Sequence, residues 1–359
     1  MWRRWAALAW ALVLITATAG CSTEEIDAAE LSKPGDYGVG ATVVEAVDAS
    51  RDDRPLRIRV FYPAQTDSEA GEPDAPAVMG GAPYPVIVGD IDISRVMGPH
   101  LASHGFAFVA LDGQHTWGLS LSPDMIDFPL DQMAALDAIE DLADGLVVGV
   151  CDTSTVGTIG YSFGGWDALM LTGARIDPNH YAQTCAARPD SWTDQWWDYI
   201  CGSAEGWDQL EQRAVDVGIA TDSGLWEPIG DERIKAAMPM AAEGYDLTGP
   251  DGLAEATADV LLVGASEDTA SDYEPATTRL FENYPNAELI TFMGADHFMI
   301  FEDDAVEQMR RFAVAFFKRQ LNGEDSYSTI LSESFVENEA ALLGETESYD
   351  RLVWGTPNG

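Results

Sequence analysis

The stretch from residue 155 to residue 171 constrains the fold more than any other part of the chain. A β-branched run ends in a GxSxG pentad at residues 160–164, and a helix-compatible segment follows at once. A strand, a sharp turn with a serine at its tip and a helix together expose the serine hydroxyl at the end of a sheet. The flanking glycines allow the close backbone approach that such a turn requires. Ser162 is therefore the candidate nucleophile, although a bare pentad also occurs by chance as an ordinary turn.

The overall charge argues against several kinds of partner. The 359 residues include 61 acidic and 19 basic side chains, which gives a formal net charge of −42. A surface of this sign repels nucleic acids and anionic membrane surfaces, so we expect neither as a partner. An apolar content of 46% is typical of a globular protein. The acidic surface either suits high salt, where self-repulsion is screened, or is simply a well-solvated exterior.

The first twenty residues indicate an export signal. Two arginines precede an apolar run at residues 5–15, which is too short to span a membrane as a mature helix. Residues 18–21, Thr-Ala-Gly-Cys, resemble a bacterial lipobox, and residues 17–19 also fit an ordinary Ala-x-Ala cleavage site. We favour lipidation of Cys21, which predicts an exported protein held at the cell envelope by a lipid anchor alone. The other cleavage site predicts a secreted protein.

A pair of cysteines falls in a tryptophan-rich segment, residues 177–226, where apolar periodicity fails. An exported protein meets an oxidising compartment in which cysteines can pair. We predict a disulfide between Cys185 and Cys201 that staples this irregular segment and leaves Cys151 unpaired; other pairings remain open. The segment is interpreted as a lid-like insertion over the site, or as the local core of a peripheral loop.

Elsewhere the apolar pattern predicts an alternation of strands and helices, which is typical of a mostly parallel sheet covered on both faces. We expect the domain to span residues 37–323, after a signal peptide (1–20) and a tether (21–36) and before an acidic tail (324–359) without a clear role. Strands are predicted at residues 41–47, 56–62, 85–88, 106–111, 155–160, 233–240, 260–264 and 287–293, and helices at residues 94–105, 130–142, 166–171 and 304–321.

A serine nucleophile needs a general base that is oriented by a carboxylate. His297 follows the last strand of the predicted domain and Asp268 follows the strand before it, so both belong to the sheet edge where ligands bind in open α/β folds. Glu267 and Asp272 are close enough in sequence to be alternative acids. The other histidines lack metal-ligand spacing to one another, so we predict no metal and no cofactor.

Two N–H donors are needed for the oxyanion that forms when a serine attacks a carbonyl. The amide of Phe163, directly after the candidate nucleophile, is the first. The second is expected from the loop after the strand at residues 85–88, and we predict the amide of Ile91.

With these residues in place, the chain resembles bacterial α/β hydrolases of the platelet-activating factor acetylhydrolase and predicted dienelactone hydrolase group. The resemblance implies the α/β-hydrolase fold and a serine nucleophile acting on carboxylic esters, and it supports Asp268 as the acid. Such proteins commonly have a His-Gly pair where this chain has Gly89-Asp90, and a histidine in place of Tyr161. The resemblance covers residues 37–321 and rests on the segments at residues 56–64, 100–106, 160–165, 263–269 and 294–298.

The predicted function is therefore that of a serine hydrolase, with a Ser162, His297, Asp268 triad and an acyl-enzyme intermediate. Its substrate would be a small-molecule or lipid ester. A lipase, a polyester hydrolase or a peptidase would need the same residues on the same fold. A non-enzymatic alternative is a surface lipoprotein that binds a partner through its tryptophan-rich insertion.

Overall fold

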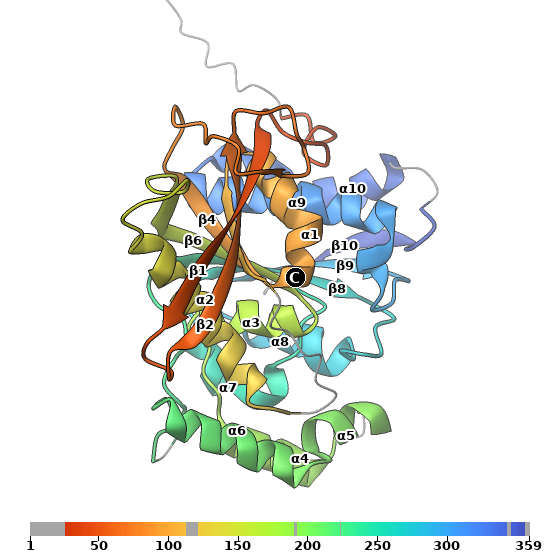
Figure 1. Cartoon of the computed structure of the whole chain (residues 1–359). Coiled ribbons are helices and arrows are strands. Elements are labelled where there is room, and N and C mark those ends of the chain that lie inside the picture. The colour runs from red at the N-terminus through yellow and green to blue at the C-terminus, as the bar shows by residue number, and fades with distance from the viewer. Residues whose placement is uncertain (1–25, 113–120, 190–191, 223, 343–345, 356–359) are drawn as a thin grey trace, which may run out of the picture.

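A computed structural model describes residues 26–112, 121–189, 192–222, 224–342 and 346–355 (Figure 1). The predicted signal peptide and Cys21 lie outside these ranges. In the ranges described, no helix combines the length and the apolar character needed to cross a membrane.

One mixed sheet forms the centre of the molecule, and within the described residues its strand order is β10-β9-β8-β7-β6-β4-β5-β2-β1-β3. The six strands from β5 to β9 in this order run parallel, whereas β2, β1 and β10 pair in antiparallel fashion. The parallel strands are apolar because helices bury both of their faces. The strands are β1 (Gly38–Asp48), β2 (Arg54–Ala64), β3 (Glu72–Pro73), β4 (Tyr84–Gly89), β5 (Ala107–Leu111), β6 (Cys151–Tyr161), β7 (Ile234–Met240), β8 (Asp259–Ala265), β9 (Ala287–Met293) and β10 (Arg351–Gly355).

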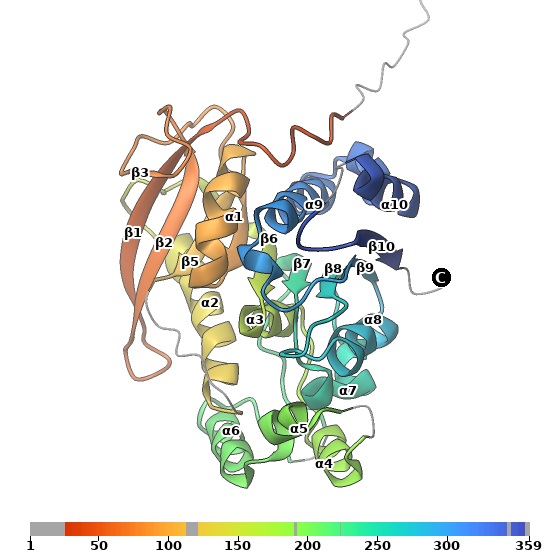
Figure 2. The same ribbon diagram turned by 90° about the vertical axis from the view of Figure 1, so that its right-hand side faces the viewer.

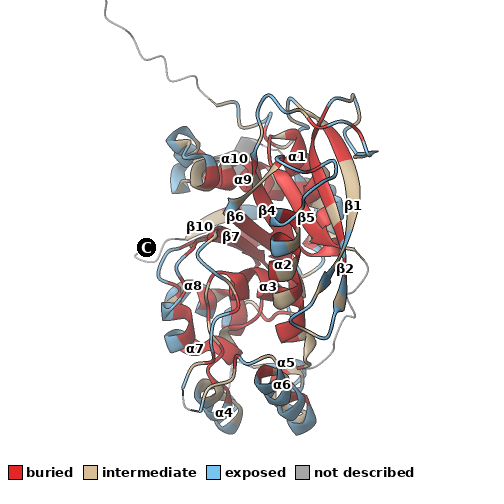
Figure 3. Cartoon of the chain, turned by 60° about the vertical axis from the view of Figure 1, so that its left-hand side comes forward, coloured by how far each residue is buried: buried red, intermediate tan, exposed pale blue. Residues whose placement is uncertain are grey.

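Helices cover the two faces of the sheet, as predicted (Figures 1 and 2). One face packs against α1 (Ile91–Ser103), α9 (Asp303–Asn322) and α10 (Glu333–Leu342). The other packs against α2 (Asp124–Glu140), α3 (Phe163–Leu171), α7 (Tyr245–Ala254) and α8 (Arg279–Asn283). The parallel strands between them are largely buried, whereas β1 and β3 at one end of the sheet and β10 at the other are partly exposed (Figure 3). Shorter helical turns are η1 (Glu274–Thr278), η2 (Met299–Phe301) and η3 (Asp325–Thr329).

The insertion at residues 177–226 is helical, which corrects the prediction of an irregular segment. It contains α4 (Pro178–Ala187), α5 (Asp194–Cys201) and α6 (Ala204–Asp216), which lie together beyond α3 and α7 (Figure 1). A side-chain cap begins each helix, from Asp177, Thr193 and Ser203 respectively. A helical repeat is present in α6, where the buried residues Gly206, Leu210 and Ala214 recur every four positions, and the prediction overlooked it. The predicted disulfide between Cys185 and Cys201 is present and joins α4 to α5, while Cys151 is a free thiol.

Both ends of the described chain are integrated into the domain. Part of the predicted tether, residues 26–36, is docked on α1 and α9: His100 Nε2 donates to the Leu31 carbonyl at 2.9 Å, and Arg311 Nε donates to the Ala28 carbonyl at 2.8 Å. The acidic tail supplies α10 and also β10, which extends the sheet beside β9. This strand was not predicted, because it has only five residues and lies in an acid-rich segment, so its apolar pattern is weak.

Candidate active site

Ser162 occupies the sharp turn between β6 and α3. Its backbone has φ 56° and ψ −118°, a left-handed conformation that is rare for a residue with a side chain. The turn is held on both sides, because Ser162 N–H donates to the Met240 carbonyl at 2.9 Å and Gly165 N–H donates to the Ser162 carbonyl at 2.8 Å. A Cβ at Gly160 would collide with the backbone of Gly164. The pentad therefore has glycine there for a steric reason.

The structure brings Ser162, His297 and Asp268 into one hydrogen-bonded chain. His297 Nε2 lies 2.9 Å from Ser162 Oγ, and His297 Nδ1 lies 2.7 Å from Asp268 Oδ2. The carboxylate can only accept, so Nδ1 carries the hydrogen and Nε2 is left to accept from the serine hydroxyl. Asp268 is itself fixed: its Oδ1 accepts the amides of Ala270 at 2.8 Å and Ser271 at 2.9 Å.

The two alternative acids do other things. Asp272 accepts a hydrogen bond of 2.8 Å from the hydroxyl of Thr193, the residue that caps α5, so it ties the insertion to the domain. Glu267 is exposed. Asp268 is 5% exposed, and it is the acidic residue for which a hydrogen bond to His297 is found in the structure.

Tyr161 supports the histidine from behind, a role that sequence reasoning missed. Its hydroxyl donates to the backbone carbonyl of His297 at 2.7 Å, and the two rings lie 5.6 Å apart. The tyrosine is buried at the end of β6, immediately before the nucleophile. The sequence did show that tyrosine replaces the more common histidine at position 161. It does not indicate what the Tyr161 hydroxyl contacts.

The predicted oxyanion donors both lie at helix N-termini. Phe163 begins α3. Ile91 begins α1, with the cap residue Asp90 between it and the end of β4, and β4 pairs with β6. The Asp90 carboxylate caps α1 by accepting the amides of Asp92 and Ile93. Among the described residues no partner is found for the Ile91 amide. Ile91 is not among the described residues that line the cavity at Ser162, whereas Phe163 is.

A cavity of about 730 Å³ opens at Ser162, between the sheet edge and α5 of the insertion. Its lining combines aromatic rings with acidic and neutral polar groups, and in the described part of the chain it includes no lysine or arginine. The lining residues are Ser162, Phe163, Gln195, Trp196, Asp198, Tyr199, Glu243, Ala270, Ser271, His297 and Phe298.

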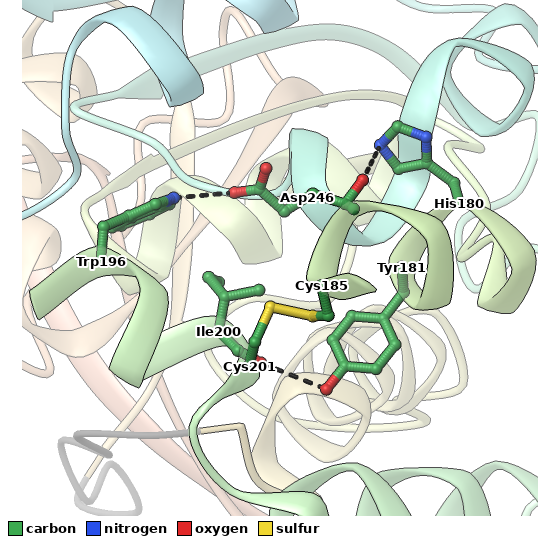
Figure 4. Close-up of a disulfide and its surroundings, with 8 residues drawn as sticks. His180, Tyr181, Cys185, Trp196, Ile200, Cys201 and Asp246 are labelled. Atoms are coloured by element: carbon green, nitrogen blue, oxygen red, sulfur yellow. Dashed lines mark hydrogen bonds between the residues drawn. A yellow bond between two sulfur atoms is a disulfide. The ribbon is translucent and has the colours of Figure 1, made fainter. Parts of the chain in front are cut away.

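Two buried carboxyls hold α5 over this cavity, and neither was anticipated from the sequence. Tyr199 Oη donates to Glu243 Oε1 at 2.6 Å, and Trp196 Nε1 donates to Asp246 Oδ2 at 3.0 Å. Figure 4 shows the indole of Trp196 pointing at the Asp246 carboxylate, with the disulfide of the insertion nearby. Burial raises the pKa of Glu243 to about 7 and the pKa of Asp246 to about 8.

Comparison with known proteins agrees with this architecture. Residues 81–312 match the sequence pattern described as the Alpha/beta hydrolase family, and this segment covers more than half of the chain and extends from the loop before β4 into α9. The chain has no significant match among curated proteins. The mostly parallel sheet with helices on both faces is the fold expected of that family. The chain therefore belongs to the alpha/beta hydrolase family.

Proposed function

We propose that the protein is a serine hydrolase that cleaves carboxylic esters, small-molecule or lipid, through an acyl-enzyme intermediate. Family membership supports hydrolase activity. The observation that carries the finer proposal is the position of His297, which bridges Ser162 Oγ at 2.9 Å and Asp268 Oδ2 at 2.7 Å. These distances fall within the range required for proton transfer between a nucleophile and its base.

In the proposed reaction Ser162 Oγ attacks the ester carbonyl carbon while His297 Nε2 takes the hydroxyl proton. The resulting imidazolium is stabilised by Asp268, which receives two backbone amides and so stays in place. His297 then returns the proton to the departing alcohol. A water molecule, activated by the same histidine, releases the acid from the serine.

Two amides are proposed to stabilise the oxyanion. Phe163 N–H stands at the first position of α3, where a helix leaves its amides without intrahelical partners. Ile91 N–H stands at the equivalent position of α1, and the Asp90 side chain takes the next two amides instead of it. Both helix N-termini follow adjacent parallel strands, β6 and β4, which supports a shared location at the sheet edge.

Labelling with a fluorophosphonate tests this proposal. The reagent is expected to modify the wild-type protein at Ser162, as located by mass spectrometry, and to inactivate hydrolysis of a short-chain nitrophenyl ester. Ser162→Ala should lose both labelling and turnover. Ser154→Ala is a matched control, since it removes an exposed serine from the same strand. Unchanged labelling in Ser162→Ala would overturn the assignment.

Export and lipid anchoring are part of the same proposal. The disulfide between Cys185 and Cys201 supports an oxidising compartment. Lipidation of Cys21 would keep the enzyme at the cell envelope. The mass of the N-terminal peptide from the natural host distinguishes the alternatives, because an acylated cysteine supports the anchor and an unmodified Cys21 thiol contradicts it.

A further inference from the structure

One carboxyl oxygen in the cavity beside Ser162 has no hydrogen-bond partner among the residues that the structure describes. Glu243 is 5% exposed and lines the cavity together with Ser162 and His297. Its Oε1 accepts the hydroxyl of Tyr199 at 2.6 Å. The other oxygen, Oε2, is not fully enclosed, and we infer that its accessible surface lies toward the cavity that Glu243 lines.

The surroundings of Glu243 favour positive charge. The described lining contains a second carboxylate, Asp198 at the exposed rim, and no lysine or arginine. The apolar part of the lining is largely aromatic, and aromatic faces attract cations. Low-dielectric walls with one sign of charge focus the electrostatic field and raise the local concentration of the opposite charge. The formal net charge of −42 on the whole chain acts in the same direction.

We propose that Glu243 recognises a cationic group on the substrate, so that the preferred substrate is an ester carrying an alkylammonium group. This inference rests on the proposed esterase function and names the substrate class of the same site. Attraction to Glu243 Oε2 would orient the ester with its carbonyl toward Ser162. Neutral esters would lack this attraction, and anionic esters would be repelled by both carboxylates of the lining.

A pair of isosteric substrates tests the proposal. Acetylthiocholine and 3,3-dimethylbutyl thioacetate have nearly the same shape and differ in charge. We expect kcat/KM of the wild-type enzyme to be at least about tenfold higher for the cationic thioester, a ratio that corresponds to about 1.4 kcal/mol of additional attraction at the transition state. In Glu243→Gln this ratio should fall to within about twofold of unity, because the amide can still accept from Tyr199 but carries no charge.

Glu205→Gln is the matched control. It removes one carboxylate from the exposed surface of α6, where Glu205 accepts a hydrogen bond from Gln209, and should leave the ratio unchanged. A ratio near one in the wild-type enzyme overturns the proposal, as does a ratio that survives in Glu243→Gln. These outcomes are distinct from failure of the esterase proposal, which would appear as retained labelling in Ser162→Ala.

Protection from labelling gives a second test that needs no turnover. Choline should slow fluorophosphonate labelling of Ser162 in the wild-type protein, and the neutral isostere 3,3-dimethylbutan-1-ol should do so at least about tenfold less effectively. In Glu243→Gln the two compounds should protect equally. Equal protection in the wild-type protein contradicts a cation site.

The substrate ratio should also depend on pH. Burial raises the pKa of Glu243 to about 7, so its carboxyl is neutral at lower pH and negatively charged at higher pH. The ratio of kcat/KM values should therefore rise between pH 6 and pH 8, and a flat or falling ratio contradicts the role of Glu243. Titration of His297 affects both thioesters alike and cancels in the ratio. The other titratable groups that act on or near this carboxyl are Tyr199 on α5, Asp167 on α3, Asp246 on α7 and Asp268 after β8.

Discussion

Tyr161→Phe isolates one hydrogen bond behind the candidate base. The substitution keeps the buried ring and removes the hydroxyl that donates to the His297 carbonyl at 2.7 Å. Leaving a carbonyl of this kind without its partner costs about 1–3 kcal/mol of folding free energy. In a chain of this size each kcal/mol corresponds to a decrease in Tm of about 2 °C. We therefore expect Tm to fall by about 2–6 °C.

The effect on catalysis is separable from the effect on stability. We argue that this hydrogen bond keeps the His297 side chain correctly placed beside Ser162. Its loss should then raise the activation free energy by up to about 1.4 kcal/mol, which lowers kcat by up to tenfold. KM should change little, because Tyr161 is not among the residues that line the cavity. The assay is hydrolysis of a short-chain nitrophenyl ester, with the rate of fluorophosphonate labelling as a parallel measure of serine reactivity.

Tyr62→Phe provides the control for this measurement. Tyr62 is fully buried on β2, and its hydroxyl donates to the Ala75 carbonyl at 2.9 Å, so the same chemical group is removed away from the cavity. Both variants should lose similar stability, and only Tyr161→Phe should lose activity. Equal kcat in the two variants would refute the idea that the Tyr161 hydroxyl positions His297, and would leave Tyr161 with a structural role alone.

Three further substitutions test the site and its insertion. Asp268→Asn should lower kcat by roughly three to four orders of magnitude, because loss of the orienting carboxylate has an effect of this size in serine hydrolases. The circular dichroism spectrum should remain unchanged, and near-normal turnover would argue for another acid. Gly164→Ala should lower Tm and abolish labelling, because its Cβ would collide with the carboxylate of Asp90, and normal labelling would contradict the steric account. Cys185→Ser breaks the link to Cys201 across a separation of 16 residues and should cost about 3 kcal/mol, so an unchanged Tm would show that the disulfide contributes nothing to stability.

The sequence predicted the central sheet well because buried parallel strands and long amphipathic helices leave strong apolar patterns. The strand predicted at residues 287–293 is β9 (Ala287–Met293), and the helix predicted at 304–321 is α9 (Asp303–Asn322). Chain order along such a sheet then brings residues after adjacent strands to one edge. That is why Asp268 and His297 could be placed beside each other without any contact information.

The parts that escaped prediction depend on contacts between distant segments. Glu243 and Asp246 follow β7 in a run with no distinctive pattern, and their importance comes from Tyr199 and Trp196, more than forty residues earlier. In the insertion, α4 and α5 are short, and the repeat of buried residues in α6 was overlooked. Their positions are determined instead by caps, a disulfide and these buried carboxyls.

The last strand has a consequence for any truncation of the chain. Without β10, the backbone N–H and C=O groups along one side of the seven-residue strand β9 would be unpaired. With it, the edge of the sheet is the five-residue strand β10, and a shorter edge recruits strands from other molecules less readily. The same strand also steadies the segment leading to His297, because Asp350 N–H donates to the Met293 carbonyl at 2.7 Å. An acid-rich C-terminus that would be an obvious candidate for trimming thus covers the longer strand β9 and braces the segment that carries His297.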